Sequence, residues 1–301
     1  MSRPVTIACF GEILWDCVPR GLFLGGAPLN VAYHLRRQGV HSVPVSAVGD
    51  DFLGREARRR ITGWGVDARC IGRDDTHPTG VVQAEIDAAG AAHYRIARGV
   101  AWDRIEVAPA LRRLRPAPDA ILFGTLALRE APNRRAVQRL LDRWPRALRV
   151  VDLNLRPPFD GPRVIGRALH EAQLVKLNDA ELGRVMRVDV RSLRDLERAA
   201  RRFAERHGLA GLCVTAGARG AGLWWDGNWH WERGKKVAVR DTIGAGDAFL
   251  AALLASLLAR NDPPEVALAR ACRTGEFVAT RDGATPEYTC DAQGRIVAPR
   301  S

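Results

Sequence analysis

The sequence lacks the usual features of secreted and membrane proteins. No Cys-x-x-Cys pair or metal-ligand spacing occurs, which excludes a disulfide framework and a zinc ribbon. The longest largely apolar run, residues 248–259, is too short to cross a bilayer. Residues 1–6 lead directly into a strand-like run and show no signal peptide. These absences predict a cytoplasmic protein with reduced, mostly buried thiols, at Cys9, Cys17, Cys70, Cys213, Cys272 and Cys290.

Lysine is scarce, because it occurs only at positions 176, 235 and 236, and arginine supplies the rest of the 46 basic residues. The formal net charge of +12 would suit a nucleic-acid-binding protein. However, the arginines are spread along the whole chain, and no aromatic-interleaved basic motif accompanies them. We therefore interpret the charge as a compositional bias on solvated helix faces. Such a surface favours the steering of anionic small molecules, and we expect no nucleic-acid or membrane partner.

Several catalytic motifs are also missing. No Gly-x-Ser-x-Gly segment occurs, which argues against a serine hydrolase, and the seven histidines show no metal-ligand spacing. The glycine-rich segment around Gly244 and Gly246 is not followed by Gly-Lys-Ser/Thr, so it is not a Walker A loop. It also lacks the third glycine of a Rossmann fingerprint. Phosphate chemistry at this segment therefore needs support from the rest of the chain.

Short β-rich runs alternate with longer helical patterns along the chain. Buried strands are predicted at 5–10, 42–48, 120–124, 149–153, 174–177 and 212–215. Helices are predicted at 29–38, 54–62, 133–144, 164–172, 179–186 and 193–207. The alternation predicts an α/β fold with a mostly parallel sheet between helices, built as one domain over residues 1–301.

Two regions alternate with a period of two instead, at residues 12–24 and 79–99. The second region reads as a hairpin of 79–86 and 91–97 across residues 88–90. A small sheet formed from both regions would project from the main body and cover a site at the strand ends. A further hairpin is predicted around residues 225–229.

The strongest functional signal is a glycine-bearing turn before an apolar helix, Asp241-Thr242-Ile243-Gly244-Ala245-Gly246-Asp247. Such a turn leaves backbone N–H groups unpaired at the positive end of the helix dipole, where they attract an anion. A carboxylate at Asp247 would repel a phosphate that was merely bound there. It fits a base that takes a proton from an attacking hydroxyl while the N–H groups hold the transferred phosphoryl group. The alternative is a loop closed by an ordinary acidic residue in the first helical turn.

Other polar segments follow the predicted strands. The glycines of Gly25-Gly26-Ala27-Pro28-Leu29-Asn30 permit close approach of a ligand, and Asp16 can accept hydrogen bonds from sugar hydroxyls. The alternative, which the segment alone favours, is a tight turn before a helix with Pro in its first turn and a solvated Asp16. Asn178 and Glu181 can hold a hydrated Mg²⁺ or form a helix capping box, and both can be true at once. The turn from Thr215 to Gly220 can receive a nucleotide phosphate or serve as a simple connection.

Taken in order, these segments resemble the ribokinase-like (PfkB) family of ATP-dependent carbohydrate kinases over nearly the whole chain. The segments are GEILWD at 11–16, GGAPLN at 25–30, VGDDFLG at 48–54, HPTG at 77–80, DLNLR at 152–156, KLNDAE at 176–181, TAG at 215–217, DTIGAGDAF at 241–249 and RDGATP at 281–286. Among subgroups, GEILWD, GGAPLNVAYHL and VAWD are most similar to bacterial fructokinases. The resemblance implies a Rossmann-like three-layer α/β/α fold with a small β-sheet lid from about 12–30 and 75–103.

The resemblance also implies roles for individual residues. Asp247 would be the general base, and Gly244, Ala245 and Gly246 the anion hole for the γ-phosphate of ATP. The sugar would contact Asp16, Gly25, Gly26, Asn30 and Arg156. The nucleotide would meet Asn178, Thr215, Gly217, Gly220, Gly244 and Gly246. Mg²⁺ would be held through water by Asn178 and Glu181, and a monovalent cation such as K⁺ by Asp241 with the carbonyls of Ile243, Val278, Arg281 and Gly283.

The sequence departs from the family pattern near the expected adenine site, because no Asn occurs near Cys272. Nucleotide preference therefore stays open. The expected reaction is transfer of the γ-phosphoryl group of MgATP to a primary hydroxyl of a small sugar, fructose first. The alternatives are 2-keto-3-deoxygluconate, ribose or a nucleoside, and a protein that only senses a sugar or nucleotide. Exposed lid edges also predict a homodimer.

Overall fold

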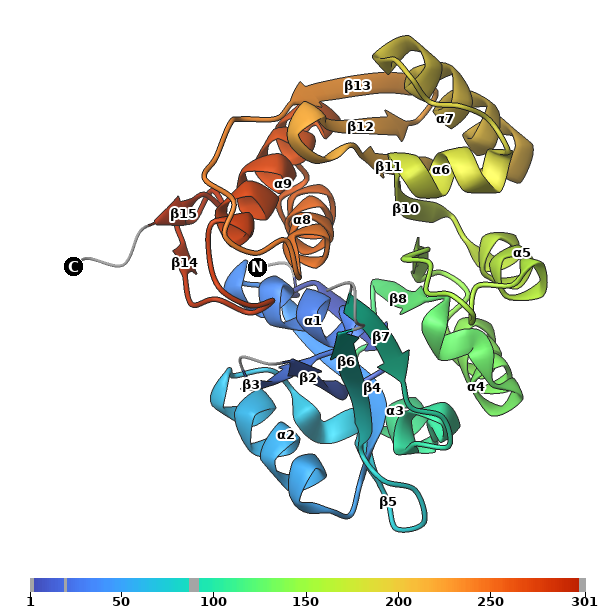
Figure 1. The fold of residues 1–301 in the computed structure, drawn as a ribbon, viewed down its shortest axis with the longest axis vertical. Coiled ribbons are helices and arrows are strands. Elements are labelled where there is room, and N and C mark those ends of the chain that lie inside the picture. The colour runs from blue at the N-terminus through green and yellow to red at the C-terminus, as the bar shows by residue number, and fades with distance from the viewer. Residues whose placement is uncertain (1–2, 19–20, 87–91, 298–301) are drawn as a thin grey trace.

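The computed structural model describes residues 3–18, 21–86 and 92–297. Its centre is a nine-stranded sheet with the order β13-β12-β11-β10-β9-β8-β1-β4-β5 (Figure 1). Neighbouring strands from β11 to β5 run parallel, and β12 and β13 add an antiparallel hairpin at one edge. The strands are β1 (Thr6–Phe10), β4 (His41–Gly49), β5 (Ile71–Asp74), β8 (Ala120–Gly124), β9 (Leu148–Asp152), β10 (Leu174–Asn178), β11 (Gly211–Thr215), β12 (Gly220–Trp225) and β13 (Asn228–Arg233).

Helices cover both faces of this sheet (Figure 1). One face carries α3 (Ala108–Arg113), α4 (Ala131–Arg143), α5 (Pro162–Glu171), α6 (Asp179–Met186) and α7 (Leu193–His207). The other carries α1 (Ala27–Arg37), α2 (Phe52–Gly63), α8 (Ala245–Leu254) and α9 (Pro264–Ala279). A hydrophobic core lies on each face of the sheet, and successive strand residues point into the two cores in turn. In β1, for example, Ile7 packs on the α1 side and Ala8 on the α4 side.

Short elements complete the chain. The 3₁₀ turns are η1 (Ala68–Cys70), η2 (Ala101–Arg104), η3 (Leu126–Arg129) and η4 (Gly217–Arg219), and a π-helical turn, η5 (Ala255–Arg260), continues α8. Strands β14 (Thr289–Cys290) and β15 (Ile296–Val297) pair near the C-terminal end. In the described part of the chain, no helix has the length and hydropathy needed to cross a membrane.

A separate four-stranded sheet forms the predicted lid, with the order β3-β2-β6-β7. It consists of β2 (Leu14–Val18), β3 (Gly21–Gly25), β6 (Gly80–Ile86) and β7 (Ala92–Ile96). Strand β2 pairs in parallel with β6, so the two sequence regions with period-two alternation meet in one sheet. Residues 27–30, which the predicted lid segment 12–30 includes, lie in α1 of the main body. The hairpin turn at 88–90 and residues 19–20 lie outside the described residues.

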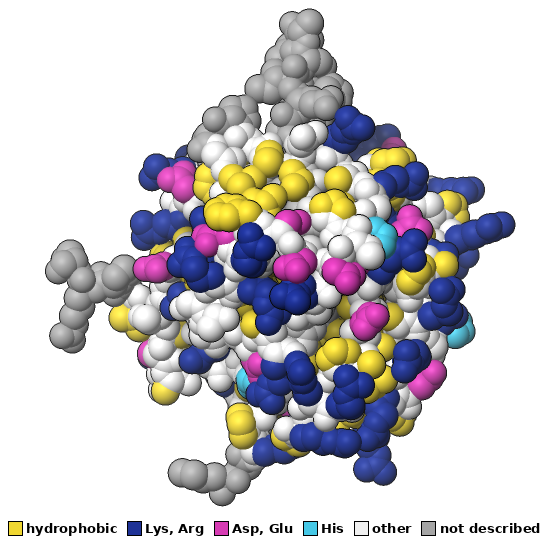
Figure 2. Space-filling model, turned by 90° about the horizontal axis from the view of Figure 1, so that it is seen from below, with side chains coloured by type: hydrophobic (Ala, Val, Ile, Leu, Met, Phe, Trp, Pro, Cys, Tyr) yellow, Lys and Arg dark blue, Asp and Glu magenta, His cyan; other side chains and the backbone are white. Residues whose placement is uncertain are grey.

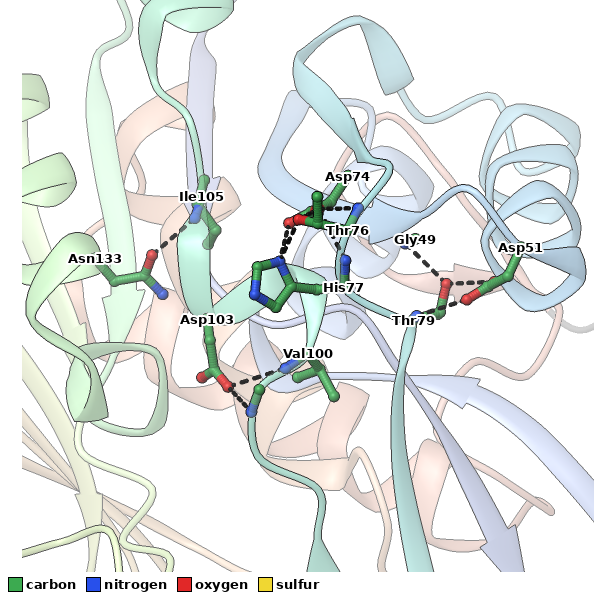
Figure 3. Close-up of polar contacts among 11 residues, drawn as sticks. Gly49, Asp51, Asp74, Thr76, His77, Thr79, Val100, Asp103, Ile105 and Asn133 are labelled. Atoms are coloured by element: carbon green, nitrogen blue, oxygen red, sulfur yellow. Dashed lines mark hydrogen bonds and ion pairs between the residues drawn. The ribbon is translucent and has the colours of Figure 1, made fainter.

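The chain enters the lid near Thr79 and leaves it near Val100, and we call these two points the lid roots (Figure 3). Side chains of the main body bind the backbone at both. At the entry to β6, Asp51 accepts hydrogen bonds from the backbone N–H of Thr79 at 2.7 Å and from the Thr79 hydroxyl at 2.7 Å. The same hydroxyl oxygen accepts from the N–H of Gly49 at 2.9 Å. After β7, Asp103 accepts from the N–H of Val100 at 3.3 Å. These contacts fix where the lid strands enter and leave.

The predicted strands and helices are confirmed, with shifts of a few residues at their ends. Helix α1 begins at Ala27 rather than 29, because Pro28 fits the first helical turn. The hairpin around 225–229 is confirmed as β12 and β13. Strand β5 was not predicted, since its four residues include a glycine and two charges and show no period-two pattern. Each of the six cysteines is a free thiol, and four of them are buried.

Asn133 lies beside Ile105, close to the Val100–Asp103 contact where the chain leaves the lid (Figure 3). It is fully buried, and its Oδ1 accepts from the N–H of Ile105 at 2.9 Å. Its Nδ2 donates to the carbonyls of Trp102 at 2.7 Å and Ala127 at 2.9 Å. One side chain therefore joins η2, η3 and α4.

We expect Asn133→Ala to lower the free energy of unfolding by roughly 2–4 kcal/mol, because three buried backbone groups lose their partner. Urea unfolding followed by circular dichroism measures the change. Asn228→Ala is the matched control, since that exposed amide makes one 3.2 Å bond to the carbonyl of Asp226. Equal effects of the two substitutions would contradict the structural role of Asn133.

Candidate active site

A cavity of about 540 Å³ lies between the lid and the carboxyl ends of the parallel strands. This is where ligands bind in open α/β sheets, because polar strand ends and helix N-termini converge there. Its lining includes the sequence-predicted residues Asp16, Gly26, Asn30, Arg156, Asn178, Thr215, Gly244, Gly246 and Asp247. A larger, open hollow of about 830 Å³ runs along α6, but most of the sequence-predicted residues line the 540 Å³ cavity, which is therefore the candidate site.

The glycine turn has the predicted form. Gly244 is the N-cap of α8 with φ 77°, a left-handed conformation that glycine adopts at no steric cost, and no side chain caps this helix. Ala245 begins the helix, and its N–H bonds the carbonyl of Thr242 at 3.3 Å. The first-turn N–H groups of Gly246 and Asp247 have no intrahelical partner, as at any helix start. Unpaired N–H groups at a helix N-terminus favour a nearby anion, as the sequence predicts for this turn.

Asp247 lies in the first turn of α8 and is 8% exposed. Its Oδ2 accepts a 2.8 Å hydrogen bond from Nδ2 of Asn30, which fixes the orientation of the carboxylate. Burial, together with the negative charge of Asp152, raises the pKa of Asp247 to about 6. A carboxylate with this pKa accepts a proton more readily than an exposed one and still loses it near neutral pH.

Lys176 is a functional candidate that the sequence reasoning missed. It is 7% exposed, and its Nζ donates to both carboxylate oxygens of Asp152, at 3.1 and 3.2 Å. A Cβ placed on Gly246 would lie 3.0 Å from this Nζ, so the ammonium lies against the Gly244–Gly246 turn. Burial works against its charge, but the Asp152 and Asp247 carboxylates raise the pKa of Lys176. A single charged residue inside a buried strand was the signal available in the sequence.

The lid side of the cavity carries two acids. Burial raises the pKa of Asp16 to about 6, against the opposing effect of Arg156. Burial also raises the pKa of Glu12 to about 7, and this side chain accepts a 3.2 Å bond from the N–H that begins α1. Gly25 leaves room for Asp16, since a Cβ there would meet Oδ2 at 2.8 Å. Gly26 has φ 117°, and a Cβ there would lie 2.3 Å from the carbonyl oxygen of Glu12.

The predicted magnesium pair forms a capping box at the start of α6. Asn178 Oδ1 accepts from the N–H of Glu181 at 2.8 Å, and Glu181 Oε2 accepts from the N–H of Asn178 at 2.8 Å. Glu181 Oε1 also accepts from the N–H of Leu155 at 2.7 Å. Among the described residues, no three His, Cys, Asp or Glu side chains form a metal-binding group. The capping box is therefore confirmed, and because it engages Asn178 Oδ1 and both Glu181 oxygens, an ion at this pair would be held through water.

The remaining predicted residues surround the cavity without all lining it. Thr215 lies at its wall, whereas Gly217 and Gly220, in η4 and at the start of β12, do not line it. Asp241 connects two loops, because its Oδ1 accepts from the N–H of Ile243 at 3.0 Å and its Oδ2 from the N–H of Gly283 at 3.2 Å. The loops predicted to hold a monovalent cation are thus adjacent. Among the carbonyl groups predicted to bind this cation, that of Val278 accepts a hydrogen bond from the N–H of Arg281 at 2.9 Å.

Arginine and lysine side chains are spread over the face in Figure 2 with acidic side chains between them. Positively and negatively charged side chains are therefore mixed on this face. Such a surface differs from the single-sign stripe that marks a nucleic-acid footprint.

Residues 8–289 match the family model described as pfkB family carbohydrate kinase. The chain is 32% identical to the fructokinase of Salmonella typhimurium over 91% of this chain and 93% of that protein. It is 30% identical to the 2-dehydro-3-deoxygluconokinase of Thermoproteus tenax, over 80% of this chain and 74% of that protein. The ATP-bound fructokinase of Xylella fastidiosa superposes with a TM-score of 0.78 at 23% identity, covering 93% and 94% of the two chains.

The raised pKa of Asp247 has a consequence for stability. Because the folded-state pKa of about 6 exceeds the ordinary value of 3.8, the folded protein binds more protons than the unfolded chain between these values. Its stability therefore falls as pH rises through this window. We expect Asp247→Asn to raise the free energy of unfolding at pH 7.5 by roughly 1–3 kcal/mol, and this gain to vanish towards pH 4.

Urea unfolding at pH 4.5 and pH 7.5 measures this difference. Asp142→Asn is the control, because Asp142 is exposed on α4 and its substitution should leave both values unchanged. A gain of equal size at the two pH values would show that the effect does not come from burying the Asp247 charge.

Proposed function

Because the chain belongs to the pfkB family of carbohydrate kinases, we propose that it transfers the γ-phosphoryl group of MgATP to a primary hydroxyl of fructose. That the protein is an ATP-dependent carbohydrate kinase follows from its relatives and fold. The observation that carries the reaction is the position of Asp247, a buried carboxylate in the anion-binding turn that lines the cavity. The choice of fructose rests on the similarity to bacterial fructokinases.

Asp247 would take the proton of the attacking hydroxyl as the oxygen–phosphorus bond forms. Asn30 holds the second carboxylate oxygen, which leaves the first free to face the hydroxyl. The hydroxyl attacks in line with the leaving oxygen of ADP, and negative charge spreads over the transferred group. The first-turn N–H groups at Gly246 and the Lys176 ammonium would stabilise this charge. The lid would keep water from competing as the acceptor.

The nucleotide and cations have proposed positions as well. Asn178, Thr215 and the Gly217–Gly220 turn would meet ATP, and Asn178 with Glu181 would hold Mg²⁺ through water. When bound, Mg²⁺ neutralises charge on the phosphate oxygens. A monovalent cation such as K⁺ would lie at the Asp241 and Gly283 loops. Asp16 and Asn30 would bind sugar hydroxyls, and Arg156 lies close enough to lower the pKa of Asp16.

A second candidate substrate is 2-keto-3-deoxygluconate. Its carboxylate would pair with Arg156, a cation that lines the cavity. The relative from Thermoproteus tenax carries the matching name. Ribose and nucleosides offer the same hydroxyl chemistry and stay in the test.

We also propose a cytoplasmic location, where the six thiols stay reduced, and a homodimer through the lid, whose edge strand β3 exposes Leu22 and Phe23.

A coupled ADP-release assay with MgATP tests the proposal against fructose, ribose, 2-keto-3-deoxygluconate, adenosine and no sugar. We expect turnover with fructose, and a fall in kcat of about 10²–10⁴-fold in Asp247→Asn with ATP binding retained. Asp142→Asn serves again as the exposed control. Turnover with another sugar would replace fructose as the substrate. ATP binding without turnover on any sugar would favour a sensing protein, and full activity of Asp247→Asn would refute its role as the base.

A further inference from the structure

We propose that His34 and Tyr288 are positioning residues that hold the Gly244 turn in its phosphoryl-binding geometry through Ala284. The inference rests on the proposed function, because it assigns the Gly244 turn to the transferred phosphoryl group. Neither residue lines the cavity among the described side chains, so both would act from behind it. The contacts that support this role lie along one face of α1, from the cavity into the interior.

Helix α1 presents Asn30 and His34 on the same face, because residues four apart lie one above the other on a helix. Asn30 donates to the Asp247 carboxylate at 2.8 Å, within the first turn of α8. His34 lies one turn further along and is fully buried. One helix face therefore contacts the catalytic turn directly and also the chain segment behind it.

The two ring nitrogens of His34 have different partners. Nε2 lies 2.9 Å from the carbonyl oxygen of Ala284, which can only accept, so Nε2 carries the proton and donates. Nδ1 lies 2.9 Å from the Tyr288 hydroxyl and accepts from it. Burial lowers the pKa of His34 to about 4, which keeps the ring neutral at physiological pH. Tyr288 thus fixes the tautomer that His34 needs to hold Ala284.

Ala284 packs directly on the anion-binding turn. A Cβ placed on Gly244 would lie 2.5 Å from the Cα of Ala284 and 2.7 Å from its carbonyl oxygen. This carbonyl oxygen is the one that accepts from His34. Any displacement of Ala284 therefore changes the space in which Gly244 keeps its φ of 77°. The neighbouring Gly283 is fixed from the other side by Asp241.

The turn is thus held at two points by one helix. Asn30 orients the Asp247 carboxylate at the cavity. His34 holds Ala284, which packs against Gly244 away from the cavity. Loss of the inner contact would let the N–H groups move away from the position of the transferred phosphoryl group. Displacements of this kind reduce the rate of the chemical step more than the binding of substrates.

Tyr33 offers a matched control on the same helix. Its hydroxyl donates to the carbonyl of Pro286 at 2.7 Å, in the same C-terminal segment but two residues beyond Ala284. Tyr33→Phe therefore removes one hydrogen bond of similar length to this segment. It leaves the contact between Ala284 and Gly244 in place.

The experiment compares His34→Leu, His34→Gln, Tyr288→Phe and Tyr33→Phe in the full-length protein. We expect His34→Leu to lower kcat about 10- to 100-fold, with the KM for sugar and for ATP nearly unchanged. His34→Gln keeps a donor for Ala284 and should recover part of the rate. Tyr288→Phe should give a smaller fall, and Tyr33→Phe should match the wild type. If His34→Leu does not fold, Tyr288→Phe and His34→Gln carry the comparison.

A second measurement separates this inference from the proposed reaction. Calorimetric titration with ADP and aluminium fluoride, a mimic of the transferred phosphoryl group, probes the turn without any sugar. We expect weaker binding in His34→Leu and Tyr288→Phe, while binding of ADP alone is unchanged. Wild-type protein that turns over no sugar would refute the proposed function, and this titration would still test the positioning role. Equal losses in Tyr33→Phe, or unchanged kcat and fluoride binding in the His34 and Tyr288 variants, would overturn the inference.

Discussion

The burial of the Asp247 carboxylate at the start of α8 is the constraint on which the rest of the site depends. A buried carboxylate is costly unless donors and cations surround it. Here Asn30 donates to it, the positive end of the α8 dipole faces it, and Lys176 lies close enough to lower its pKa. Burial still dominates, so the carboxylate keeps a raised proton affinity. The burial that destabilises the folded protein near neutral pH therefore also raises the proton affinity that the proposed base role of Asp247 needs.

In the proposed reaction, the same turn attracts a phosphoryl group while it carries the negative charge of Asp247. Lys176 helps to resolve this conflict, because its ammonium lies against Gly246 and is paired with Asp152 rather than with Asp247. The pairing keeps Lys176 charged inside the protein and restricts where it can point. The Asp247 carboxylate and the Lys176 ammonium thus both lie beside the Gly244–Gly246 turn, and Asp152 separates their charges by pairing with Lys176. The lid contributes Asp16 on the remaining side, and its roots are fixed by Asp51 and Asp103.

Much of the fold could be predicted from local pattern. The buried parallel strands are continuous apolar runs, the helices show a period of 3.6, and the lid strands alternate with a period of two, so each type was recognisable. Strand β5 was missed because four residues with a glycine carry too little pattern. The glycine turn at 244–246 and the capping box at Asn178 and Glu181 were predicted because both are local motifs. Their roles in binding ATP and Mg²⁺ stay predictions that assays must test.

The sequence by itself determined the α/β class, the two regions that contribute the lid strands and the glycine turn before Asp247, since each depends on residues close together in the chain. Only the tertiary structure decided which distant side chains meet there. The Asn30–Asp247 and Lys176–Asp152 bonds, like the path from Tyr288 through His34 and Ala284 to Gly244, join segments separated by up to some 250 residues. The burial that raises the pKa of Asp247 is equally a property of packing. Neither spacing nor composition encodes such contacts, because they arise when strand order and helix packing bring separate elements together.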